Sequence, residues 1–191
     1  GILGHTIEIP EGNEESYKAG RNAVLGGIDF LNQDPDRLLE MRLNFYLRGL
    51  NKTEDPKAEN ELVGPNGEIV GRVKNGRPKF FPDYYVIPMS LDKDNDAQEA
   101  FNMIDYFKRN GVLVKELKED IGNYKKGDLV IDMAQAKRGY ANHILYKGSN
   151  ESAWAAMYAE LLVNFPDVRG FKSEPVFADG LFNGKLGEVT T

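Results

Sequence analysis

Apolar residues recur at helical spacing through most of the first 50 positions of the chain. After Asn13, a typical helix N-cap residue, an apolar face follows the 3.6-residue period of an α-helix. Its members are Tyr17, Gly20, Val24, Ile28 and Leu31. A second such face follows Asp34-Pro35, with the members Leu39, Leu43, Tyr46, Leu47 and Leu50. We therefore predict two successive helices, with Gly49 near the end of the second.

The residues that flank these helices show other patterns. Residues 2–9 read as a strand, and Pro10 removes the next backbone donor, so we predict that the strand ends there. From residue 51 onward the chain turns to Asn, Lys, Glu, Asp, Pro and Gly, and Gly64-Pro65-Asn66-Gly67 is a strong turn signal. We interpret residues 53–79 as a linker or an irregular hairpin.

Strand and helix patterns alternate in the second half of the chain. Aromatic and β-branched runs predict three strands, at residues 84–89, 112–117 and 129–133. Helical spacing predicts a helix at residues 96–109 and a longer one at residues 151–164. The longer helix would bury Trp154, Met157, Tyr158, Leu161 and Leu162. Strands and helices in this order, with short connections, indicate an α/β domain with a mainly parallel sheet flanked by helices.

Composition narrows the classes of function. The 191 residues carry a net charge of −6, which disfavours binding to a nucleic-acid backbone because such binding needs clustered Lys and Arg. No window approaches the ~18 consecutive apolar residues of a membrane span, so we expect this chain to be soluble. The first residue is Gly1, which we interpret as a sign of processing or an expression remnant, so secretion stays open.

The histidines give weak signals for catalysis. His5 and Glu8 have the spacing of a short zinc motif, but residues three apart on a strand point to opposite faces, and a site needs about three protein ligands. We therefore predict no metal site in this chain. His143 is the only other histidine, and no nucleophile motif accompanies it, so we assign it no role.

Polar residues follow the predicted strand at residues 129–133. Asp132, Gln135 and Arg138 would lie at the carboxyl end of that strand, where open α/β sheets usually bind ligands. We consider two functions for them, a pocket for an anion or a peptide, and hydrogen bonds that cap the strand and hold the following segment. A concave site lined by the three residues would favour binding, and hydrogen bonds from them to the backbone would favour a structural role.

Several stretches resemble the C-terminal half of bacterial zinc carboxypeptidases of the carboxypeptidase A-like metallopeptidase family. The first stretch is Gly4-His5-Thr6-Ile7-Glu8-Ile9-Pro10 with the helical pattern after it. The others are residues 81–88, 130–139 and 164–171. The resemblance implies that Glu8 is the catalytic general acid/base carboxylate, which takes a proton from zinc-bound water and passes it to the leaving amine. It implies zinc as the cofactor of the full-length protein and peptides as its substrate, from which C-terminal residues are removed.

The resemblance also divides the chain. Residues 1–52 correspond to the last strand and helices of the peptidase domain, and residues 80–175 to an accessory α/β domain, with residues 176–191 as a tail. The accessory domain is similar to class I glutamine amidotransferase-like domains, whose fold is flavodoxin-like. Enzymes of that wider fold commonly use a cysteine nucleophile, and the absence of cysteine excludes that chemistry here.

The resemblance further implies that the metal-binding part of the enzyme lies outside this chain. The upstream zinc ligands, and the arginine that would hold the carboxylate of the substrate, find no counterpart. We expect the chain to be inactive alone, with the N-terminal peptidase domain as its partner and a secreted or cell-surface parent protein. The edge of the strand at residues 2–9 would then be exposed and would favour a homodimer. The accessory domain has either a structural role or a role in binding peptide or cell-wall material.

Overall fold

A computed structural model describes residues 7–9, 11–54, 79–90, 95–147, 149–150 and 161–189 of the chain. It divides into two compact units, Gly1–Leu47 and Arg48–Thr191. Each unit is described by itself below. The domain boundaries expected at residues 52, 79 and 175 stay predictions.

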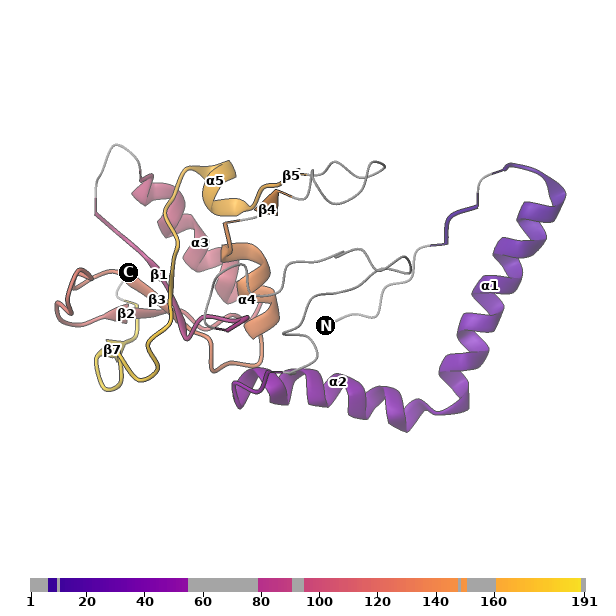
Figure 1. Cartoon of the computed structure of the whole chain (residues 1–191), viewed down its shortest axis with the longest axis horizontal. Coiled ribbons are helices and arrows are strands. Elements are labelled where there is room, and N and C mark those ends of the chain that lie inside the picture. The colour runs from indigo at the N-terminus through magenta and orange to yellow at the C-terminus, as the bar shows by residue number, and fades with distance from the viewer. Residues whose placement is uncertain are drawn as a thin grey trace. The chain divides into compact units, whose positions relative to one another are not determined.

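The first unit consists of the two predicted helices (Figure 1). Helix α1 spans Glu14–Gln33, and the side chain of Asn13 caps it by accepting a hydrogen bond of 2.9 Å from the Ser16 N–H. Helix α2 spans Pro35–Leu50, so its last turn belongs to the second unit. Both helix predictions are confirmed. Of the strand predicted at residues 2–9, residues 2–6 lie outside the described part, and Ile7–Ile9 belong to no strand.

The second unit contains a five-stranded sheet with the order β6-β1-β3-β2-β7. The strands are β1 (Tyr84–Ile87), β2 (Lys115–Leu117), β3 (Leu129–Asp132), β6 (Glu174–Val176) and β7 (Leu186–Gly187). All four neighbouring pairs are antiparallel. The prediction of a mainly parallel, flavodoxin-like or glutamine amidotransferase-like sheet is therefore wrong.

The position of β3 explains why the prediction of a parallel sheet failed. Helix α3, Ala97–Arg109, connects β1 to β2, and these two strands do run in the same direction because both pair antiparallel with β3. They are not neighbours, however, since β3 lies between them. The chain enters β3 through a turn after β2, in which Gly127 has a φ of +96° and donates its N–H to the Leu117 carbonyl. The connection, residues 118–128, is shorter than the crossover of about a dozen or more residues that a parallel pair needs, so it favours an antiparallel pair.

Strands β1 and β3 are buried on both faces of the sheet, which is why these two strands read as continuous apolar runs. On one face, Tyr85, Ile87 and Ile131 pack with apolar residues of α3 and of α4, Arg138–Leu145. On the other face, Tyr84 and its neighbours form a second cluster around the aromatic ring of Phe182. Its buried members are Tyr84, Val86, Leu117, Val130, Val176 and Phe182.

The C-terminal part of the chain contributes to this sheet and to a small separate one. Strands β4, Ser149–Asn150, and β5, Leu161–Leu162, form the separate two-stranded sheet, and the short helix α5 spans Phe165–Arg169. The helix predicted at residues 151–164 is therefore wrong at its C-terminal end, where β5 lies. Residues 151–160 and the turn at residues 64–67 lie outside the described part. Among the described residues, no helix is long and apolar enough to cross a membrane.

Candidate functional site

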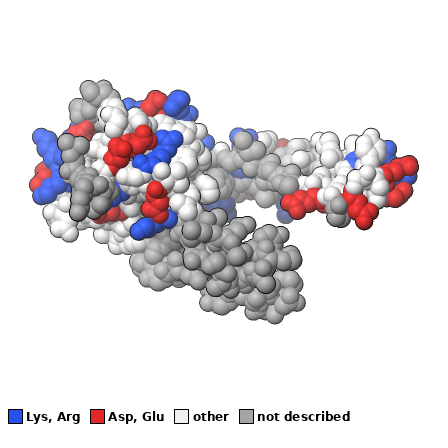
Figure 2. All heavy atoms as spheres, turned by 90° about the horizontal axis from the view of Figure 1, so that it is seen from above, with Lys and Arg blue, Asp and Glu red and all other residues white. Residues whose placement is uncertain are grey.

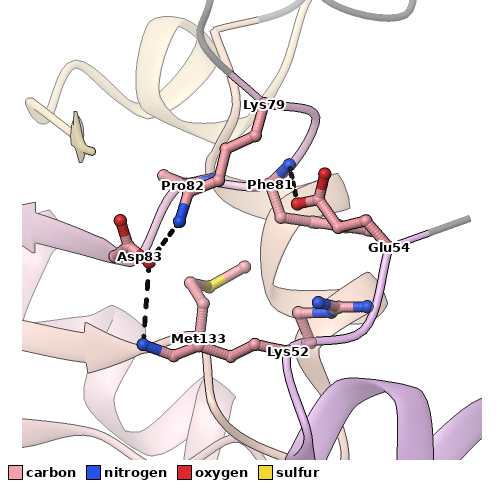
Figure 3. A pocket seen from close by; sticks show the side chains of 8 residues that line it. Lys52, Glu54, Lys79, Phe81, Pro82, Asp83 and Met133 are labelled. Carbon is pink, nitrogen blue, oxygen red and sulfur yellow. Dashed lines mark hydrogen bonds and ion pairs between the residues drawn. The ribbon is translucent and has the colours of Figure 1, made fainter. Parts of the chain in front are cut away.

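A half-open cavity of about 250 Å³ lies within the second unit, beside the start of β1 (Figure 3). It is lined by Lys52, Glu54, Lys79, Phe81, Pro82, Asp83, Met133 and Arg138. The lining combines three cations, two carboxylates and an apolar wall.

A buried carboxylate, that of Asp83, organises one side of the cavity. Asp83 is 2 % exposed and directly precedes β1, and its N–H donates to the Val176 carbonyl at 2.8 Å. The ammonium group of Lys79 donates to Oδ1 of Asp83 at 2.5 Å, and that of Lys52 lies 3.6 Å from the same oxygen. Figure 3 shows the two ammonium groups approaching Asp83 from opposite sides. A carboxylate this deeply buried needs such partners, because an unpaired buried charge is costly.

Lys52 connects this buried carboxylate to an exposed one. Its ammonium group donates to Oδ1 of Asp179 at 2.6 Å and lies 5.3 Å from the centre of the Tyr84 ring. Burial by itself lowers the pKa of Lys52, but the hydrogen bond to Asp179 and the negative charges of Asp132 and Asp179 outweigh it, so the pKa is raised. The same hydrogen bond, with the charge of Lys52, holds the pKa of Asp179 below its ordinary value.

The opposite side of the cavity is formed by Glu54 and Arg138. The carboxylate of Glu54 accepts hydrogen bonds from the N–H groups of Phe80 at 3.2 Å and of Phe81 at 3.1 Å. The guanidinium group of Arg138 lies 4.2 Å from the centre of the Phe81 ring and donates to the Thr53 carbonyl at 2.5 Å. Its pKa is lowered, mainly by burial and against the charge of Glu54. Both charged groups are thus held in place by the backbone.

The structure brings the predicted cluster of Asp132, Gln135 and Arg138 together, but all three side chains bind backbone groups. Oδ1 of Asp132 accepts from the Ala134 N–H at 2.8 Å. Gln135 is 2 % exposed, and its amide accepts from the N–H of Leu113 at 2.9 Å and donates to the Asp132 carbonyl at 2.6 Å. Of the three, Arg138 lines the cavity. Such hydrogen bonds to the backbone hold the segment that follows β3 in place.

The residues predicted from the zinc motif lie elsewhere. Glu8 is exposed and belongs to the first unit, and His5 lies outside the described residues. His143 is exposed near the end of α4, where its carbonyl accepts from the side chain of Asn164 at 2.6 Å. Within the described part of the chain, no group of three or more His, Cys, Asp or Glu side chains could hold a metal ion.

Sequence reasoning missed most of the residues that line the cavity. Lys52 and Lys79 stand at the two ends of the segment interpreted as a linker, and nothing in the local pattern shows that they meet. Asp83 did offer a signal, because an acidic residue between Pro82 and a continuous apolar strand is placed where burial is expected.

The eight described residues that line the cavity together carry ammonium, guanidinium and carboxylate groups, and none of them is a serine, threonine, cysteine or histidine. Comparisons with protein-family models, with curated proteins and with solved structures give no match for this chain. The interpretation of its function therefore depends on its own residues.

Proposed function

We propose that this chain is the C-terminal part of a zinc-dependent metallocarboxypeptidase, in which its second unit acts as a structural accessory domain. The structural role is supported by the hydrogen bonds of the Asp132, Gln135 and Arg138 side chains. These side chains were the best candidates for a ligand site at the end of a strand, and all three bind backbone groups instead. Side chains held in this way stabilise a loop and leave little capacity for a ligand.

The apolar surface of the first unit supports the proposal that it belongs to a larger domain. Helix α1 buries no residue, although its apolar residues share one face. Along that face Tyr17 is 71 % exposed and Ile28 is 49 % exposed. A helix with such a stripe normally lies against a hydrophobic core. In a peptidase domain, the remaining strands and helices would supply that core.

Glu8 is proposed as the acid/base residue of the complete enzyme. Its side chain is exposed, so it is accessible to a substrate or to another part of the protein. The described residues offer no set of zinc ligands, and we therefore assign no catalytic step to this chain alone. The metal ligands would come from the peptidase domain.

A substitution in the full-length protein tests the role of Glu8. We expect Glu8→Gln to abolish the release of C-terminal residues from a peptide while the zinc content stays unchanged, because the substitution removes only the group that accepts the proton. Glu11→Gln is the matched control, since Glu11 is also an exposed glutamate close by. Equal activity of the two variants would contradict the proposal.

Calorimetry on the present chain tests the missing metal site. We expect neither zinc binding nor release of a C-terminal residue from a peptide. Tight one-to-one binding accompanied by turnover would show that the chain holds its own site, and His5, Glu8 and His143 would be the first residues to substitute.

A second function, binding of a ligand without catalysis, is favoured by one observation. The cavity beside Asp83 has charged groups at fixed positions and an apolar wall, as small-molecule sites usually do. A structural domain does not exclude such a site.

A further inference from the structure

Two ammonium groups, those of Lys52 and Lys79, line one side of the cavity beside Asp83. The cations Lys52, Lys79 and Arg138 face the carboxylates of Glu54 and Asp83 in the lining, and Asp179, outside the lining, pairs with Lys52 at 2.6 Å. Lys52 therefore already has a carboxylate partner, and that partner is exposed. Figure 2 shows that acidic and basic side chains are interspersed on the face that it presents. Ammonium groups at the wall of a half-open cavity can bind an anionic ligand whose carboxylate takes the place of Asp179.

Two ammonium groups in the cavity have the capacity to bind that anion. Each ammonium carries three N–H donors, and one oxygen of Asp83 takes at most one from each. For Lys52, the other carboxylate partner is Asp179, whose side chain is 75 % exposed. An ion pair this exposed contributes little stability, so a ligand carboxylate can compete with Asp179 for the ammonium of Lys52.

The remaining charged groups keep the shape of the cavity fixed. Both oxygens of Glu54 accept backbone hydrogen bonds, from Phe80 and from Phe81. Arg138 is held between the Thr53 carbonyl and the Phe81 ring. A ligand would therefore enter a preformed site and would not have to order these side chains, which lowers the entropic cost of binding.

The floor and the size of the cavity limit what the anion can be. Met133 is fully buried, and Figure 3 shows its side chain between those of Lys52 and Lys79. With Pro82 and the Phe81 ring it forms an apolar wall. The cavity of about 250 Å³ is smaller than the ~300 to 1,000 Å³ typical of sites for drug-sized molecules. It suits a short ligand with an anionic head and an apolar body.

We propose that this cavity binds a short-chain organic carboxylate, with its oxygens on the ammonium groups of Lys52 and Lys79 and its hydrocarbon part on Met133. The proposal is independent of the peptidase function, because it uses no residue of the first unit. It gives the second unit a ligand-binding role that the polar cluster at Asp132 does not provide.

The decisive experiment titrates butyrate into the 191-residue chain labelled with ¹³C at the methionine methyl groups. At constant ionic strength, we expect the methyl signal of Met133 to shift and to saturate in the millimolar range, because so small a ligand makes few contacts. Met103 is the internal reference, since it is fully buried and does not line the cavity. A titration that leaves the Met133 signal unchanged would overturn the proposal.

Variants and analogues then identify the groups involved. We expect Lys79→Gln to weaken butyrate binding about tenfold, as the loss of one charge-assisted hydrogen bond does. Lys125→Gln should bind as the original chain does, because Lys125 pairs with Asp120 and does not line the cavity. Equal affinity of both variants would show that the ammonium of Lys79 takes no part.

A neutral analogue keeps the test valid if Lys79→Gln fails to fold. Butyramide has the size of butyrate without its charge, and we expect it to bind the original chain at least tenfold more weakly. Equal binding of the two compounds would contradict recognition of a carboxylate. Tighter binding of inorganic phosphate than of butyrate would also overturn the proposal, because the apolar wall would then contribute nothing.

Discussion

The helices of the first unit and the sheet of the second unit come from equally regular sequence patterns, yet their apolar residues end in opposite environments. Helix α1 has a clear apolar face and buries none of its residues. Strand β1 buries all four of its residues, and α3 buries Ala100, Met103, Ile104 and Phe107. The comparison teaches that a periodic pattern determines the local conformation and which face is apolar. Whether that face is buried depends on a second helix or strand that packs against it.

Substituting one phenylalanine in each unit should show the largest contrast. Phe107 is fully buried in the core of the second unit, whereas Phe30 in α1 is 69 % exposed. We expect Phe107→Ala to lower the free energy of unfolding by about 3 to 5 kcal/mol, because it leaves a cavity. Phe30→Ala should change it by about 0.5 kcal/mol or less. Urea denaturation measures both, and a large loss for Phe30→Ala would show that α1 has a buried face in solution.

Removing a buried amide should give the next largest effect. Gln135→Ala leaves the N–H of Leu113 and the carbonyl of Asp132 without their partner inside the protein. We expect a loss of about 2 to 3 kcal/mol in the free energy of unfolding. The control is Gln33→Ala at the exposed end of α1, which should be near neutral. A neutral Gln135→Ala variant would mean that the amide does not hold this loop.

Two glycine-to-alanine substitutions should change the free energy of unfolding in opposite directions. A methyl group at Gly49 would meet the carbonyl oxygen of Gln135, which is part of the backbone and cannot move freely. We expect Gly49→Ala to cost about 1 to 3 kcal/mol. A methyl group at Gly26 in α1 meets nothing within 4 Å, so Gly26→Ala should stabilise the helix by about 0.5 to 1 kcal/mol. Thermal unfolding separates the two outcomes, and stabilisation by both variants would show that Gly49 is not in close contact with Gln135.

The smallest effect concerns the exposed ion pair at Asp179. Because Lys52 lowers the pKa of the Asp179 carboxyl group below 3.8, the pair contributes stability above that pH and loses it as the pH falls through the lowered pKa. An NMR titration of Asp179 should show the low midpoint, and Lys52→Gln should return it toward 3.8. Lys18→Gln in α1, which removes a surface pair with Glu14, should leave the Asp179 midpoint unchanged. An Asp179 titration midpoint that stays the same in Lys52→Gln would contradict the pairing of Asp179 with Lys52.

The sequence predicted several elements correctly and their arrangement poorly. The two N-terminal helices, α3, β1 and β3 lie where the periodicity placed them, because that signal is local, whereas β2 begins at Lys115 and covers only the second half of the strand predicted at residues 112–117. The sequence did not show that β3 enters between β1 and β2, since a strand-helix-strand unit is compatible with direct pairing and with insertion of a third strand. Strands β6 and β7 were missed because they are short and lie at the edges of the sheet.

The candidate site shows the same limit. Asp132, Gln135 and Arg138 are close in the sequence and were found together, but their partners, such as the Leu113 backbone and the Thr53 carbonyl, are distant in the sequence. Lys52 and Lys79 both lie beside Asp83 in the cavity, although they stand at either end of a long segment. No local sequence pattern predicts this proximity. Long-range contacts of this kind depend on the tertiary fold.

The insertion of β3 between β1 and β2 has a consequence for the order in which the sheet can assemble. Residues 118–128 connect β2 to β3, a much shorter connection than residues 88–128 between β1 and β3, so closing the β2–β3 hairpin costs less entropy and we expect it to form early. Strand β1 also pairs with β3, but the whole of α3 separates them in the chain, so we expect β1 to join after the hairpin. We therefore expect substitutions in the β2–β3 hairpin to slow folding, and substitutions in β6, which pairs last along the chain with β1, mainly to speed unfolding.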